Sequence, residues 1–336
     1  MAKGIQGFSP KEFTCWIASD ATNAGATGLS ASSMYQLDVD SIGYPSLNVT
    51  QALDVRSGIG RTLKDEDFFQ DNTMRVVELS LSGTLHNDVG HLLLLKNICH
   101  DVSADAGHPE IATGHVGSSQ KYIESTAVNN AASSLTVALR PSSHSHAKSL
   151  VFPGMVVTNF AISADAGTEG GRYKFSATLQ SGYKPSLNEA STLAGNTPYA
   201  NTTHSLLSAS SGHKVMNSDV VMNSFTTTID HPAVFSGTCS TGFEVVSRGA
   251  ECSVTIDTQV KYDTETKTLV NGFDTQAAHN GTNSFVVTND DKYGIMVHNA
   301  VYTNVAYSEG DIMMLDISMK VVDDGTDALI AFDVTD

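Results

Sequence analysis

The feature that most constrains the fold is an alternation of apolar and polar side chains that recurs along most of the chain. The stretch 75–82 reads RVVELSLS, so Val77, Leu79 and Leu81 fall on one side of an extended strand. The same period of two returns in five further stretches: 155–163, 172–180, 221–230, 251–261 and 311–322. Gly, Asn, Asp and Ser separate these stretches at spacings typical of antiparallel hairpins. The sequence therefore predicts a mainly β protein, an antiparallel sandwich or barrel.

One segment breaks the alternation and predicts a short α-helix at about 88–99. Asn87 or Asp88 can cap its first turn, and four consecutive leucines follow at 92–95. A fully buried strand is the alternative interpretation, since four leucines are compatible with that too. We favour the helix because leucine lacks the β-branching that strands prefer.

The loose, polar stretches of the chain suggest a division into four parts. We expect an N-terminal arm or extension at 1–46, a first β-sandwich unit at 47–185, a loop or linker at 186–218 and a second β-sandwich unit at 219–336. The stretch 186–218 is rich in Ser, Thr, Asn and Ala, and so long a structureless segment is unusual inside a compact domain. A chain of 336 residues can hold two cores of about 150 residues each, or one large core.

An apparent internal repeat supports two tandem units. Residues 156–163 (VVTNFAIS) resemble part of 220–230 (VVMNSFTTTID), if inserted residues are allowed. Each is followed by a glycine-containing turn and another alternating strand, 172–180 in the first case and 251–261 in the second. Two related sheet units on either side of the linker would explain this pattern.

The charge balance argues against a protein that grips nucleic acid through its phosphates. The chain has 36 acidic and 19 basic residues, a net charge of −17, and the basic residues are scattered. Phosphate binding needs a basic surface. Charged residues make up 16% of the chain, below the roughly 25% of an ordinary soluble domain. There is no apolar run long enough to span a membrane and no apolar segment of a secretion signal near Met1, so we expect no membrane association and no secretion.

Nucleophile, phosphate-loop and zinc-protease motifs are absent from the sequence. It contains no G-x-S-x-G, no H-E-x-x-H and no Walker A loop. The stretch 57–60 (SGIG) lacks the third glycine of a dinucleotide-binding loop and is better explained as a tight turn. The stretch 38–43 fits the first positions of a calcium loop, but Ile42 and Val49 stand where ligands are needed. We therefore expect no enzyme.

The histidines and cysteines do not form a recognisable metal site either. His144 and His146 could share one face of a strand, but no nearby acid or cysteine completes a set of ligands. The four cysteines contain no C-x-x-C pair, and we expect them to be reduced, although Cys239 and Cys252 could face each other across a hairpin. The sequence predicts no catalytic, cofactor-binding or metal residues and no cofactor.

The order of elements carries a family resemblance. The strand at 76–84 ends in Ser-Gly-Thr and is followed at once by the leucine-rich helix. The segments 152–163 (FPGMVVTNFAIS) and 170–180 (GGRYKFSATLQ) then form a strand and a returning hairpin. Residues 220–230, 253–257 and the final strands look like a second copy. This succession, over about 70–336, resembles the major tail tube proteins of long-tailed bacteriophages in a larger, duplicated form.

The resemblance implies a β-sandwich subunit with one small helix, which assembles with copies of itself into stacked rings. The inner sheets would join into a continuous β-barrel, the conduit for DNA delivery into the host cell. Six sandwich units per ring would need six copies, or three copies in a pseudo-hexameric ring if the chain is duplicated. Further implied partners are the tape measure and terminator proteins, and a sheath in a contractile tail. The protein would be assembled in the host cytoplasm and located in the virion tail.

Two other readings stay open at this point. The alternative function is a β-rich virion decoration protein or an adhesin or other binding module, and a hydrolase with a site spread over loops is the third. A single tryptophan, Trp16, and few clustered tyrosines argue against the aromatic patches that a binding module needs. For the tail tube reading we expect interfaces at 8–13, 101–117 and 186–218, and an acidic lumen past which DNA moves without specific binding.

Overall fold

The computed structural model describes most of the chain, and the fold is mainly β, as the alternation predicted. The described residues are 10–19, 34–45, 51–53, 68–70, 76–86, 88–101, 119–124, 134–141, 148–183, 185–189, 196–199, 206–207, 212–236, 245–248, 251–273, 279–288, 293–309, 311–323 and 329–335. The prediction of an antiparallel sandwich or barrel class is confirmed.

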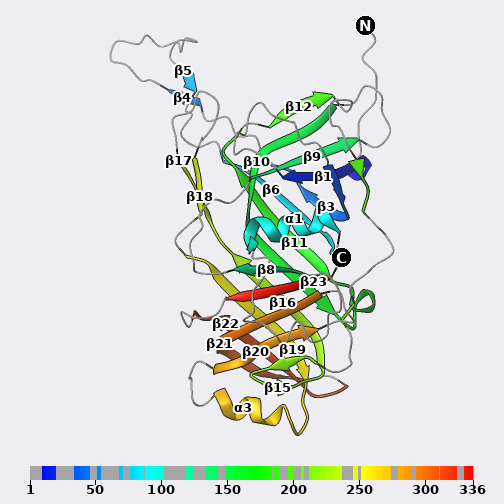
Figure 1. Ribbon diagram of the computed structural model, residues 1–336, viewed down its shortest axis with the longest axis vertical. Helices are drawn as coiled ribbons and strands as arrows, with labels where there is room; N and C mark the ends of the chain where they lie inside the picture. The colour runs from blue at the N-terminus through cyan, green and yellow to red at the C-terminus, as the bar shows by residue number, and fades with distance from the viewer. Residues whose placement is uncertain are drawn as a thin grey trace.

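Eight antiparallel strands pair in one continuous row that runs through the molecule (Figure 1). All six alternating stretches form strands in it. Its order is β3 (Val39–Gly43), β6 (Val77–Thr84), β11 (Lys174–Ser181), β10 (Lys148–Asp165), β16 (Met222–Asp230), β19 (Ser253–Lys261), β22 (Met314–Val321) and β21 (Tyr293–Ser308).

The two longest strands, β10 and β21, each leave this sheet and enter a second layer. The first half of β10 pairs with β9 (Leu135–Pro141) and β12 (Ser186–Glu189), and β9 pairs in turn with β1 (Phe13–Ser19) and β1 with β2 (Met34–Leu37). The first half of β21 pairs with β20 (His279–Thr288) and β23 (Ile330–Thr335). Outside these lie the strands β14 (Lys214–Val215), β15 (Ser218–Asp219), β8 (Ser119–Glu124) and β7 (His100–Asp101).

The remaining elements are short. They are the hairpin of β4 (Gln51–Leu53) and β5 (Phe68–Gln70), the hairpin of β17 (Ala233–Ser236) and β18 (Val245–Arg248), the two-residue strand β13 (Asn196–Thr197), which runs parallel to β2, the 3-10 turns η1 (Pro10–Glu12) and η3 (Glu169–Gly171), and the helix α3 (Lys267–Phe273). The turn η3 belongs to the connection between β10 and β11.

The predicted helix is confirmed as α1 (Val89–Ile98). Asp88 is its N-cap, and the Asp88 carboxylate accepts a hydrogen bond from the His91 backbone N–H. Leu92, Leu94 and Leu95 are buried in the core between the layers. The amide oxygen of Asn97 accepts from the backbone N–H of Val157 at 2.7 Å, which ties the helix to the middle of β10.

The same succession of paired strands occurs twice along the chain. In the first half, β3 pairs with β6, β6 with β11, β11 with β10, and β10 with β9 and β12. In the second half, β16 pairs with β19, β19 with β22, β22 with β21, and β21 with β20 and β23. A helix follows the second strand of each set, α1 after β6 and α3 after β19. The chain therefore contains two copies of one sandwich unit, placed in the upper and lower halves of Figure 1.

Two β-bulges occur at corresponding positions in the two copies, and they align the copies residue by residue. The pairing of β10 with β11 skips Thr158, and that of β21 with β22 skips Thr303. Likewise the pairing of β3 with β6 skips Asp40, and that of β16 with β19 skips Asn223. Counted from the threonine bulges, VVTNFAIS (156–163) aligns with VYTNVAYS (301–308), identical at five of eight positions.

The repeat expected from the sequence was therefore wrong in its pairing of segments. Residues 220–230 contain β16, the counterpart of β3, and 251–261 contain β19, the counterpart of β6. The true counterpart of 156–163 is 301–308. Strands of period two resemble one another whatever their place in a sheet, and only the pairing register separates them.

The expected N-terminal arm and linker also differ from what the structure shows. Residues 1–46 include β1, β2 and β3, which pair inside the first copy, and 186–218 include the short strands β12 to β15. The paired strands of the two copies thus run over 13–189 and 214–335. The reason is that β1 buries Cys15, Ile17 and Ala18 without a clean alternation, so its sequence does not look like a strand.

Candidate assembly surface

Two strand edges are open at the opposite ends of the eight-stranded sheet. At one end β3 pairs with β6 along one edge, and at the other end residues 304–308 of β21 pair with β22 along one edge. Within the described part of the chain, no strand pairs with the second edge of either segment. An open edge presents N–H and C=O groups that another strand can pair with.

The strand junction inside the chain shows how such edges can be joined. β10 of the first copy pairs with β16 of the second over seven residues, from Asn159 opposite Asp230 to Asp165 opposite Ser224. In the repeat, β10 corresponds to β21 and β16 corresponds to β3. The two open edges are therefore the counterparts of the two strands that the chain already joins internally.

Corresponding side chains are buried at the internal junction and exposed at the open edges. Ile162 and Thr227 face each other across the internal junction, and each is 1% exposed. Their counterparts on the open edges are Tyr307, which is 53% exposed, and Tyr44, which is 42% exposed. Large apolar rings at the two sheet ends thus lie in solvent at positions that the internal junction covers.

Each exposed tyrosine is held by an aromatic neighbour. The Tyr307 ring meets Tyr262 edge to face with centroids 5.7 Å apart, and the Tyr44 ring meets Phe13 in the same manner at 6.5 Å. Tyr262 directly follows β19 and Phe13 begins β1, so each ring is positioned by strands of its own copy.

The side of the eight-stranded sheet that faces away from the core is polar and acidic on balance. A row of side-chain hydrogen bonds crosses it: the Asn223 amide donates to Gln259 at 2.7 Å, and Gln259 donates to Asp316 at 2.8 Å. Within the described strands of this sheet, the charged residues at positions on the polar face are six acids, Asp40, Glu78, Asp165, Asp230, Asp257 and Asp316, and three lysines, Lys174, Lys261 and Lys320. The polar face therefore carries a net negative charge.

A buried cluster anchors the start of β3 to the helix α1. His86 Nε2 lies 2.8 Å from Asp38 Oδ2, and the Asp38 backbone N–H donates to His91 Nε2 at 3.3 Å. Since His91 Nε2 accepts a hydrogen bond, His91 carries its proton on Nδ1, which donates to Asp88 Oδ1 at 2.7 Å. The ring of Tyr199 stacks on His86 with centroids 5.2 Å apart. The position of the open edge is thus fixed by a network inside the first copy.

The cluster lowers the pKa of the Asp88 carboxyl group. Burial by itself would raise the pKa of Asp88, but the hydrogen bonds from the His91 ring and backbone hold that pKa below its ordinary value. The charged form of Asp88 is therefore part of the folded structure.

A glycine permits the close crossing of β3 and β6. A Cβ atom at Gly83 would lie 2.0 Å from the Asp38 carbonyl oxygen and 2.8 Å from Val39 Cα. Neither backbone atom can move without displacing β3, so only glycine fits at this position.

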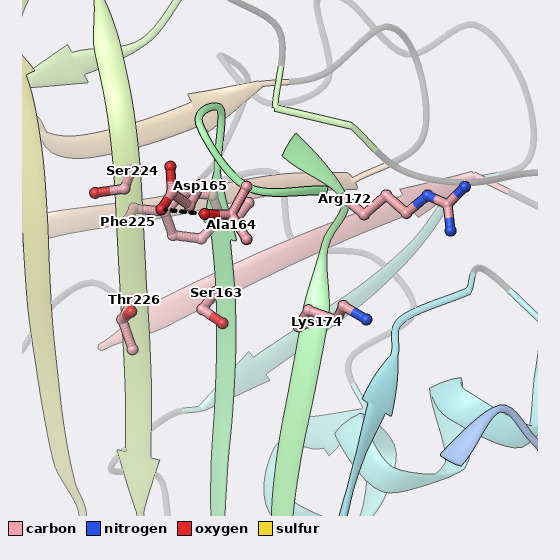
Figure 2. A pocket seen from close by; sticks show the side chains of 9 residues that line it. Ser163, Ala164, Asp165, Arg172, Lys174, Ser224, Phe225 and Thr226 are labelled. Carbon is pink, nitrogen blue, oxygen red and sulfur yellow. Dashed lines mark hydrogen bonds between the residues drawn. The ribbon is translucent and has the colours of Figure 1, made fainter. Parts of the chain in front are cut away.

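A surface hollow of about 370 Å³ lies where β10, β11 and β16 meet, at one end of the internal junction (Figure 2). Two of its charged groups, Asp165 and Lys174, make contacts within the fold. The Asp165 carboxylate accepts from the Gly167 N–H at 2.7 Å and from the Thr168 hydroxyl at 3.0 Å, which closes the turn between β10 and β11. Lys174 Nζ lies 3.0 Å from Asp40, and Figure 2 shows Arg172 and Lys174 pointing away from Asp165.

Several residues that the sequence singled out receive no site role. Residues 57–60, His144, His146 and Cys239 lie outside the described residues. The stretch 38–43 forms β3 rather than a calcium loop. In the part of the chain that the structure describes, no group of three or more His, Cys, Asp or Glu could hold a metal ion, and no helix is long and apolar enough to cross a membrane.

The expected interface segments compare only in part with the open edges. Residues 8–9 and 102–117 lie outside the described residues, and the described parts of 186–218 contain the short strands β12 to β15. The sequence reasoning missed both Tyr44 and Tyr307. The signal that could have found them is the shared pattern V-x-T-N-x-A-x-S at 156–163 and 301–308.

Comparison with known proteins adds no assignment to the chain. It matches no family model and no curated protein. The functional conclusion therefore rests on the duplicated fold and its two open edges.

Proposed function

We propose that this protein is a structural subunit that joins copies of itself edge to edge into a ring, and that stacked rings form the tube of a phage tail. The observation that carries this proposal is the internal junction of β10 with β16. The chain contains one such junction between its two copies. The two ends of its eight-stranded sheet, β21 and β3, correspond to the two sides of that junction.

Edges that differ from each other favour a head-to-tail assembly. If β21 of one chain binds β3 of the next, every chain leaves the same pair of edges open, and the series ends only when a ring closes. Closure also removes the aggregation hazard of two open edges. With two copies of the unit per chain, three chains supply the six units of a pseudo-hexameric ring.

The polar face suits the inside of a conduit for DNA. In a closed ring the eight-stranded sheets join into one barrel, and the polar face with six acids and three lysines lines the lumen. Negative charge repels phosphates, so the DNA passes without being held. In this proposal the protein acts without a cofactor and without catalysis.

The alternative, a virion decoration protein or binding module, predicts a protein that does not form closed rings. The test is to concentrate the purified chain and measure its mass by light scattering, with negative-stain electron microscopy of the same sample. We expect rings or hollow tubes. A Tyr307→Lys variant, which places a charge on the open edge, should stay monomeric, whereas Thr255→Lys on the polar face should still assemble. Discrete wild-type monomers at high concentration would contradict the proposal.

A further inference from the structure

We infer that β21 of one chain pairs antiparallel with β3 of the next chain in one defined register. Tyr307 then lies opposite Tyr44, and Ser308 lies opposite Gly43. This inference rests on the proposed self-assembly and adds to it the partner of each edge residue.

The register follows from the bulges that align the two copies. Ile162 lies four residues after the bulge at Thr158, and Tyr307 lies four residues after the bulge at Thr303. On the partner side, Thr227 lies four residues after Asn223, and Tyr44, the residue that follows β3, lies four residues after Asp40. Because Ile162 pairs with Thr227 inside the chain, the same geometry brings Tyr307 opposite Tyr44 between chains.

Neighbouring pairs continue the same pattern. Ser163 lies opposite Thr226 in the internal junction, and their counterparts are Ser308 and Gly43. These belong to the polar side of the sheet in both copies, while Ile162, Thr227, Tyr307 and Tyr44 point to the core side. A slip of one residue between the chains would join the core side of one chain's sheet to the polar side of the next, so Tyr307 and Tyr44 would no longer lie on the same face.

The side chains support this pairing over its alternatives. Directly opposite residues in antiparallel strands have Cβ atoms about 4.5–5.5 Å apart, and aromatic pairs are among the favourable cross-strand contacts. Both tyrosine rings are exposed in the single chain. Joining the edges would bury them between Phe13 of one chain and Tyr262 of the other. A slip of two residues would instead place Tyr44 opposite Val305, which already packs against its own core.

The pairing can be tested with cysteines on assembled rings. In the variant Tyr44→Cys with Tyr307→Cys, mild oxidation should give covalent oligomers up to the full ring on a denaturing gel. The matched control, Tyr44→Cys with Val305→Cys, tests the slip of two residues and should give less than a tenth of that product. Each single variant should give no dimer, because the junction joins two different edges. Ser163→Cys with Thr226→Cys, inside one chain, shows the yield that this geometry allows.

A second measurement needs no substitution. Photo-oxidation of wild-type rings should form dityrosine between Tyr44 and Tyr307 as the main crosslink between chains, identified by mass spectrometry of peptides. Rings that crosslink through Val305, or that give neither the disulfide nor the dityrosine, would overturn the register while leaving self-assembly intact. A wild-type chain that forms no rings would overturn the proposed function itself.

Discussion

Thr158 in β10 and Thr303 in β21 occupy the same bulge position in the two halves of the chain. An extra residue in one strand bends it and changes which edge atoms it offers to a neighbour. Asn159 and Asn304 follow directly in both copies. The two strands therefore present the same edge, which in β10 pairs with β16 of the same chain and in β21 has no partner among the described residues.

Replacing Gly83 should release β3 from the sheet. In Gly83→Ala the new methyl group would overlap the Asp38 carbonyl, and overpacking of this kind costs about 1–3 kcal/mol. We expect a loss of about 3 kcal/mol, the upper end of that range, in the free energy of unfolding, measured in urea, and loss of assembly. The control is Gly170→Ala, where nothing lies within 4 Å and the left-handed backbone costs about 1–2 kcal/mol. Equal losses in the two variants would contradict the crossing described here.

Acid should weaken the anchor of β3 through Asp88. The pKa of Asp88 lies below its ordinary value in the folded protein, so its contribution to stability is present above the unfolded value, about 3.9, and is lost as the pH falls through the folded value. Asp88→Asn keeps an N-cap but removes the charge. We expect a loss of about 1 kcal/mol at pH 7.

The measurement is urea unfolding between pH 7 and pH 3. The wild type should lose more stability over this range than Asp88→Asn, while Asp311→Asn, at an exposed acid, should follow the wild type. Parallel pH profiles for the wild type and Asp88→Asn would show that the negative charge of Asp88 does not stabilise the fold.

Cys15 should be unreactive in the folded protein. Burial raises the pKa of its thiol to about 12, so almost no thiolate exists at pH 8, and the side chain is inaccessible in β1. Alkylation with iodoacetamide, followed by mass spectrometry of the peptide, should therefore proceed at the rate of unfolding and rise with added urea. Rapid labelling without denaturant would mean that β1 does not belong to the core.

Reversing charge on the polar face should create an affinity for DNA. Glu78→Lys with Asp257→Lys changes the charge of that face by four units without touching the open edges. We expect rings that now bind duplex DNA in a salt-dependent manner, whereas wild-type rings do not. Fluorescence anisotropy of labelled DNA at two salt concentrations measures this. Glu265→Lys, near α3, is the control and should not bind. Wild-type rings that bind DNA tightly would contradict an acidic lumen.

Much of the fold was predictable from local pattern, because strands that bury one face must alternate. The strands around Leu79, Ile162 and Phe225 all follow this rule, and the helix capped by Asp88 was predictable from its leucines. The strand β1 was not, since Cys15, Ile17 and Ala18 are buried through contacts with distant β9.

The candidate site was harder to predict from the sequence than the fold. Tyr44 and Tyr307 are ordinary residues in the sequence, and they gain meaning only from pairing registers that join segments far apart along the chain. The five identities between 156–163 and 301–308 were visible, but nothing local distinguishes them from other strands of the same period.

The most direct test of the account is a cryo-electron microscopy reconstruction of the assembled protein. We predict a closed ring in which the eight-stranded sheets form one uninterrupted inner barrel, with β21 of each chain hydrogen-bonded to β3 of the next and Tyr307 beside Tyr44. A ring held together by other surfaces, with β3 and β21 still open to solvent, would contradict it.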